Sequence, residues 1–258
     1  MLRRLPLILM SALILFAAGC QDIMKDIKSG LTEEEIVAGL KKALEVGTDT
    51  SVKRLHAVNG FYQDQLLKIL LPPEADVIFT QINKLPGAVK DTLQNQIEKV
   101  VQSMNRSAED AAVKATPIFV KAITEITIED GINILHGADT AATHYLKGKT
   151  FNPLRDAFKP DILNSLRKPL VFNQSAESLY GDLINGYNTA ADAYNVLILF
   201  TGEPAIPKIT NNSLSNHVTT KALTGLFHKV GDEERMIRKD PLHRVSEILK
   251  KVFGELDR

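Results

Sequence analysis

The chain has 258 residues, and its 31 basic and 31 acidic side chains give a formal net charge of zero. This balance argues against nucleic-acid binding, which normally requires a strong basic excess. The length allows one sizeable core or two small ones, and no stretch after the N-terminal segment approaches the roughly 20 apolar residues of a transmembrane helix.

The first nineteen residues have the pattern of a secretion signal. Arg3 and Arg4 precede an apolar stretch at 5–16, which is too short to cross a hydrocarbon core of about 30 Å as a helix. Small residues follow at 17–19, directly before Cys20, the single cysteine of the chain. This ending resembles the lipobox of bacterial lipoproteins, in which the cysteine thiol receives a diacylglycerol group.

We therefore expect a signal peptide at 1–19, a lipid on Cys20, a tether at 20–30 and a helical domain at 31–258. The lipid attaches the protein to a membrane, with the domain outside the cytoplasm. Gln21 does not favour inner-membrane retention by the rule used in enteric bacteria, so we expect the outer membrane. The alternative is an ordinary secreted protein in which the cysteine has no role.

Helix signals begin immediately after the tether. Thr32 and Glu35 form a capping-box pattern, and apolar residues at helical spacing follow until a stop at Asn59. A second element is expected within 73–86. The strongest amphipathic stripe contains Leu93, Ile97, Val100, Val101, Met104, Ala108 and Ala111.

Shorter helices are expected to begin at Pro117, Thr127 and Asp139, because Gly137 and Pro160 interrupt the pattern.

The C-terminal part of the chain repeats the helical pattern. Another long stripe runs through 218–237, and Asp240 is expected to cap the last helix, which would bury Val245 with the apolar residues that follow. Alternation with a period of two is almost absent from the whole chain. We therefore predict an all-α, single compact multi-helix domain, with room for one short β-hairpin near 196–209.

The run from Tyr194 to Phe200 is the most apolar stretch after the signal segment. We expect it to be buried, because a large apolar side chain gains roughly 1.5–3 kcal/mol on leaving water. The alternative is an exposed segment that docks a membrane-associated partner, since a surface loop rich in proline, glycine and asparagine follows it.

Several patterns that suggest chemistry are incomplete. Residues 148–150 end like a phosphate-binding loop, but Thr143 stands where that loop requires a glycine. His217 and His228 share one face of a predicted helix, yet about 16 Å along its axis separates them, too far to share a metal ion. We expect no metal and no cofactor.

Charged pairs on the predicted helices do not point to catalysis either. Glu234 and Arg238 stand four residues apart, and such pairs are usually solvent-exposed and worth a few tenths of a kcal/mol. The nucleophile, zinc and redox motifs of common enzyme families are absent. We therefore expect a protein that is not an enzyme.

Ordered motifs at 39–41, 103–109, 141–145, 218–227 and 233–241 resemble the bacterial envelope family catalogued as domain of unknown function 4197. The resemblance covers nearly the whole chain after the signal segment. It implies a helical, often lipid-anchored, single-domain protein, and it brings no known activity and no functional residues.

If the domain has a cleft, the polar residues within these apolar motifs are the candidates to line it, because buried polar groups need partners. They are Asn105, Arg106, Glu109, Thr143, Glu233 and Arg238. For each of them, a structural role in packing helix against helix is the favoured interpretation, and a ligand contact is the alternative.

The leading hypothesis is a non-enzymatic, lipid-anchored envelope protein that binds another envelope protein or acts in assembly. This hypothesis predicts an apolar patch on the surface. The alternatives are a helical carrier, which would hold a small apolar ligand in an internal pocket, and an unrecognised hydrolase, whose cleft would contain groups with strongly shifted pKa values.

Overall fold

The computed structural model describes residues 30–125, 127–129, 131–210 and 213–257. The expected signal peptide, Cys20 and nearly all of the 20–30 tether lie outside these residues. The described chain is all-α, as predicted, and contains no strand. The prediction of a short β-hairpin near 196–209 is therefore wrong, because the only β-type pairing among the described residues is an isolated bridge between Val171 and Gln174.

The helices follow one another along the chain with short connections. In order they are α2 (Glu33–His56), α3 (Asp76–Gln81), α4 (Gly87–Ala112), α5 (Ala115–Glu125), α6 (Gly131–Leu135), α7 (Ala141–Leu166), α8 (Ala176–Leu197), α9 (Ser215–Lys239) and α10 (Glu247–Phe253). Single 3₁₀ turns lie at η1 (Pro73–Ala75), η2 (Ile82–Lys84), η3 (Pro241–His243) and η4 (Gly254–Asp257).

The start and the end of α2 have the clearest local signals, and both lie where the sequence predicts them. The hydroxyl of Thr32 accepts from the backbone N–H of Glu35, and the Glu35 carboxylate accepts from the backbone N–H of Thr32, both at 3.2 Å. This capping box begins α2. The helix ends at His56, just before Asn59 takes a left-handed conformation with φ of 69°.

Helix α7 differs from the expectation of short pieces. It continues unbroken through Pro153 and Pro160. A proline inside a helix frees a carbonyl one turn earlier. Both prolines lie on the exposed face of α7, where water can bond the freed carbonyls, while Leu154, Phe158 and Ile162 on the opposite face are buried in the core.

The C-terminal helix also begins later than predicted. The Asp240 carboxylate accepts from the backbone N–H of Leu242 at 2.9 Å, but it caps only the turn η3. Helix α10 starts at Glu247, so Val245 precedes it and is 69% exposed. Of the other apolar residues of α10, Leu249, Val252 and Phe253 are buried as expected, and Ile248 is half-buried.

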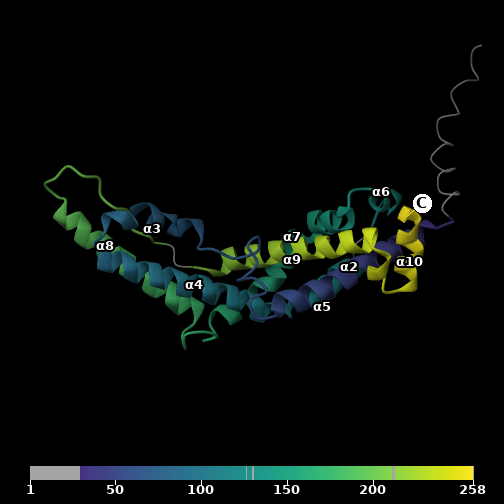
Figure 1. Ribbon diagram of the computed structural model, residues 1–258, viewed down its shortest axis with the longest axis horizontal. Coiled ribbons are helices and arrows are strands. Elements are labelled where there is room, and N and C mark those ends of the chain that lie inside the picture. The colour runs from purple at the N-terminus through teal and green to yellow at the C-terminus, as the bar shows by residue number, and fades with distance from the viewer. Residues whose placement is uncertain (1–29, 126, 130, 211–212, 258) are drawn as a thin grey trace, which may run out of the picture.

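Figure 1 shows an elongated molecule, with α2, α9 and α10 toward one end and α4 and α8 extending to the other. Helix α9 packs against α2 and α7, α4 packs against α7 and α8, and α10 packs against α2. Lys251 of α10 forms an ion pair with Glu35, so the start of the described chain lies beside α10. One continuous cluster of buried apolar side chains joins these helices.

Among the described residues, no helix combines the length and the apolar character needed to cross a bilayer.

Candidate functional site

Three of the six candidate residues hold the segment between α2 and α3 against α4. The Asn105 side chain is buried, and its carbonyl oxygen accepts from the backbone N–H of Ile69 at 2.8 Å. Its amide nitrogen donates to the backbone oxygens of Ile69 at 2.8 Å and Val101 at 2.7 Å. Asn105 therefore pairs with the segment as a neighbouring strand would.

Glu109, one turn further along α4, binds the same segment closer to α2. Its buried carboxylate accepts from the backbone N–H groups of Asn59, Phe61 and Tyr62 at 3.1, 3.1 and 3.2 Å. Arg106 forms an ion pair with it at 2.7 Å. Both carboxylate oxygens thus have partners within the protein, and the charge of Glu109 is compensated.

A second polar cluster lies where α6, α7 and α9 meet. The buried Glu234 carboxylate accepts from the backbone N–H groups of Ala142 and Thr143 at 3.0 and 2.7 Å, and from the Thr143 hydroxyl at 2.6 Å. These N–H groups belong to the first turn of α7, and the N–H groups of a first turn have no hydrogen-bond acceptors within their own helix. A negative charge there also interacts favourably with the helix dipole.

Arg238 completes this cluster at the end of α6. Its guanidinium donates to Glu234 at 2.8 Å and to the backbone oxygens of Leu135 and Ile134 at 2.6 and 3.0 Å. The expectation of a solvent-exposed pair is therefore wrong, because both side chains are buried. The pair connects the end of one helix to the start of the next.

Glu233, the last candidate, points to a different neighbour. It is buried and forms an ion pair with Arg54, which joins α9 to α2. The six candidates thus fall into separate groups, on α4 and around α9. Their polar atoms bind other parts of the protein and hold helices and connecting segments together.

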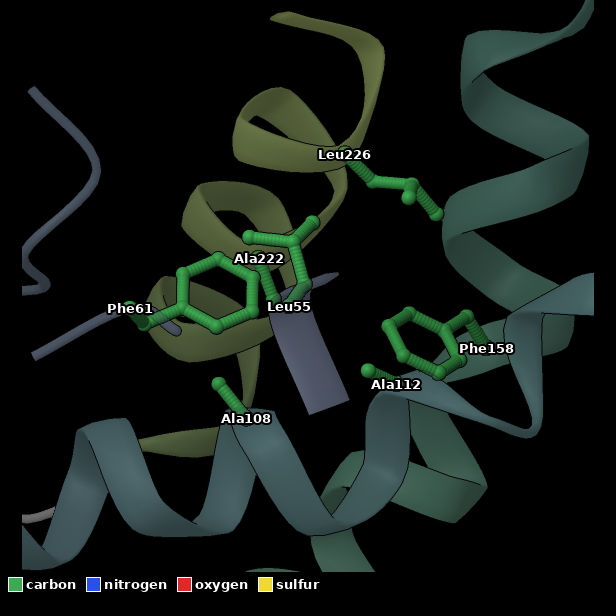
Figure 2. Close-up of a pocket in the computed structure, with 7 residues that line it drawn as sticks. All are labelled: Leu55, Phe61, Ala108, Ala112, Phe158, Ala222 and Leu226. Carbon is green, nitrogen blue, oxygen red and sulfur yellow. The ribbon is translucent and has the colours of Figure 1, made fainter. Parts of the chain in front are cut away.

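The core contains a small apolar void where α2, α4, α7 and α9 meet. Figure 2 shows the side chains that surround it. They are Leu55, Phe61, Ala108, Ala112, Phe158, Ala222 and Leu226. Its volume is about 10 Å³, which corresponds to a single water-sized probe. This void is far too small for an organic ligand.

The clearest pKa shifts also lie in the core. Burial raises the pKa of Tyr180 to about 12, with a smaller effect from the Glu74 charge, and burial raises the pKa of Tyr187 to about 12. The Tyr187 hydroxyl donates to the backbone oxygen of Pro207 at 2.9 Å. These shifts arise from packing in the core and do not define a pair of groups for acid–base catalysis. In the part of the chain that the structure describes, no three His, Cys, Asp or Glu side chains could hold a metal.

A surface feature emerges at the end of α8. Val196, Leu197, Leu199 and Phe200 form what we call the apolar tip, and Leu197 and Phe200 are 76% and 98% exposed. The expectation of a buried run is therefore wrong for these four residues. Figure 1 shows the loop after α8 at the far end of the molecule from α10.

The loop that follows explains why the tip is exposed. Asn195 exchanges two hydrogen bonds with the backbone of Ile206, at 2.7 and 2.9 Å, and Asn188 does the same with Ile209, both at 2.9 Å. These bonds draw Ile206 and Ile209 into the core, where both are buried. The loop thus supplies the apolar contacts at this end of α8, and the chain between it and the helix extends into solvent.

A groove lies between α7 and α9, and charged and imidazole side chains line it together with Thr143. Of the residues that line it, the sequence indicated only Thr143. His144 and Lys147 on α7, and His228 and Arg235 on α9, stand at spacings of three and seven residues. Helical spacing of polar residues on two neighbouring helices was the available signal, but the sequence does not say which helices are neighbours.

The sequence pattern of the family described as "Protein of unknown function (DUF4197)" matches residues 30–254. The chain belongs to this family. The DUF4197 match extends from the first residue of the described chain to the end of α10, and so includes both polar clusters, the groove and the apolar tip. Neither a curated protein nor a solved structure matches the chain.

Proposed function

We propose that this DUF4197 protein is a lipid-anchored, non-enzymatic protein of the bacterial cell envelope that binds a partner protein through its apolar tip. Cys20 and the small residues before it support the lipid anchor, because they follow the lipobox pattern. Export directed by residues 1–19 would bring the domain outside the cytoplasm, and Gln21 does not favour retention in the inner membrane, which supports the outer membrane.

The apolar tip is the observation that carries this proposal. Exposure of four neighbouring large apolar side chains to water is unfavourable. Clusters of exposed apolar side chains mark contact surfaces more often than single exposed apolar side chains do. Each side chain gains roughly 1.5–3 kcal/mol when a partner buries it fully.

The scaffold beneath the tip favours binding because it is already ordered. Asn188 and Asn195 fix the loop on the tip's C-terminal side, and α8 supports the tip from its N-terminal side. A preordered surface loses less conformational entropy when it binds. The described chain begins beside α10, at the end of the domain opposite the tip, which favours a partner protein over the anchoring membrane as the contact of the tip (Figure 1).

The two alternative hypotheses have less support. The core void is water-sized, which disfavours a carrier of small apolar ligands, and the shifted tyrosine pKa values are explained by packing rather than by a catalytic cleft. We do not propose either function.

Site-specific photo-cross-linking in cells tests the proposal. A photoreactive phenylalanine analogue replaces Phe200 at the tip or, as a control, Leu242, which is 89% exposed beside α10. We expect a discrete heteromeric adduct from position 200 that position 242 does not form. The same adducts from both positions, or an adduct with lipid or with a second copy of the chain, would contradict a partner protein at the tip.

A further inference from the structure

The groove between α7 and α9 has a volume of about 300 Å³. Its buried lining residues, Thr143, Phe227 and Gly231, form the floor. Gly231 allows the helices to approach closely here, because a Cβ atom at that position would lie 3.2 Å from the Thr140 methyl carbon. The groove is therefore a consequence of how the two helices pack, and it lies next to the buried Glu234 cluster.

The walls of the groove carry polar side chains from both helices. On α9, the Asp232 carboxylate accepts from the Arg235 guanidinium at 2.9 Å and lies 3.5 Å from the His228 ring nitrogen Nδ1. Arg235 thus compensates the one acidic side chain of the groove. On α7, Lys147 has no acidic partner within the described residues, and its ammonium lies 5.7 Å from the ring centroid of Phe151.

This arrangement suits an anion rather than a metal. The cations of Lys147 and Arg235 outnumber the single carboxylate of Asp232, so the groove carries a positive charge before any contribution from its histidines. A metal ion would be repelled by these cations, and no three suitable ligands converge anywhere in the described chain.

We propose that this groove binds the phosphate group of a small ligand. The α7 wall carries the Lys147 ammonium and the His144 imidazole, and the α9 wall carries the Arg235 guanidinium and the His228 imidazole. A phosphate group presents three acceptor oxygens to such donors, whereas a carboxylate presents two. A volume of about 300 Å³ is at the small end of the range for ligand sites. A soluble phosphate ester and an anionic lipid headgroup share this chemistry.

Titration calorimetry on the full-length chain in a neutral detergent tests the ligand class. The probes are inorganic phosphate, glycerol 3-phosphate, its water-soluble dibutyryl ester and acetate. We expect the phosphate compounds to bind, and acetate to bind at least about tenfold more weakly, because it leaves donors on one wall unpaired. Tighter binding of the dibutyryl ester than of glycerol 3-phosphate assigns a lipid headgroup, and equal binding assigns a soluble ester. Absence of saturable phosphate binding up to about 10 mM, or equal binding of acetate, would overturn the proposal.

A pair of lysine variants tests the location. Lys147→Gln removes the groove's unpaired cation, whereas Lys149→Gln removes an exposed cation two residues away that does not line the groove. We expect Lys147→Gln to weaken phosphate binding by about tenfold or more, and Lys149→Gln to leave it within about twofold. Because both side chains lie at the surface, circular dichroism should report the same helix content for both. Equal affinities of the two variants would place the anion elsewhere and overturn the proposal.

Discussion

Replacement of Glu109 by alanine tests how the polar residues of α4 stabilise the fold. The change removes the acceptor of three backbone N–H groups, those of Asn59, Phe61 and Tyr62, and leaves Arg106 without its ion-pair partner. The side chain is buried, so water does not simply replace the lost carboxylate. The segment between α2 and α3 would then lose its attachment near α2.

The expected loss of stability follows from these contacts. Removing one partner of a buried charge pair typically costs about 3–5 kcal/mol, and each buried donor left unpaired costs about 1–3 kcal/mol, although such costs do not add fully. We expect the free energy of unfolding to fall by about 3–5 kcal/mol, a large fraction of the roughly 5–15 kcal/mol that holds a domain folded. The melting temperature should fall by about 6–20 °C.

Urea unfolding followed by circular dichroism measures this loss. Glu125→Ala is the matched control, because Glu125 is also a helical glutamate in an ion pair, with Lys121 at 3.9 Å, but is exposed. The control should change stability by less than about 1 kcal/mol. Hydrogen exchange should also accelerate at the amides of Phe61 and Tyr62 in Glu109→Ala. Equal destabilisation by the two variants would refute the reasoning.

Three further predictions follow from other parts of the chain. A fatty-acid probe should label the wild-type protein and not Cys20→Ser, and equal labelling would exclude the lipid. Gly39→Ala places a Cβ atom 2.6 Å from a side chain of α10 and should destabilise the protein by about 1–3 kcal/mol. Gly181→Ala has open space around it and should stabilise α8 by about 0.5–1 kcal/mol. Thermal melts that rank the two variants the other way would contradict the packing. The hydrogen bond from Lys229 at 2.8 Å holds the pKa of Asp64 below its ordinary value, so its stabilisation is present above about pH 4 and lost as pH falls through the lowered pKa. Urea unfolding should therefore show a stability difference between wild type and Asp64→Asn at neutral pH that disappears in strong acid, and a difference that grows in acid would reverse the sign.

Local signals made much of the fold predictable. The capping box at Thr32, the stripe that became α4 and the stripe in 218–237 each depend on residues within a few turns of one another. The continuity of α7 was not predictable in the same way. Whether Pro160 breaks a helix depends on which face it occupies, and that is decided by the packing of α7 against α4 and α9.

The surfaces and polar clusters depended on contacts between distant parts of the chain. Glu234 and Arg238 look like a solvent-exposed pair until the start of α7 and the end of α6 are placed beside them. The hairpin prediction failed because Asn188 and Asn195 bind the loop backbone in place of a second strand. Burial of the run from Tyr194 to Phe200 was predicted from its apolar character alone, without the competition from the loop that follows.

The most direct test of the apolar tip combines stability and cross-linking in the same samples. Leu197→Asp introduces a charge at the tip, and Leu66→Asp introduces one at an equally exposed leucine elsewhere. Both variants should unfold within about 0.5 kcal/mol of the wild type, because neither side chain is buried. Only Leu197→Asp should abolish the adduct formed by a photoreactive group at position 200. A loss of several kcal/mol in Leu197→Asp, or an adduct that persists in it, would contradict the tip as the binding surface.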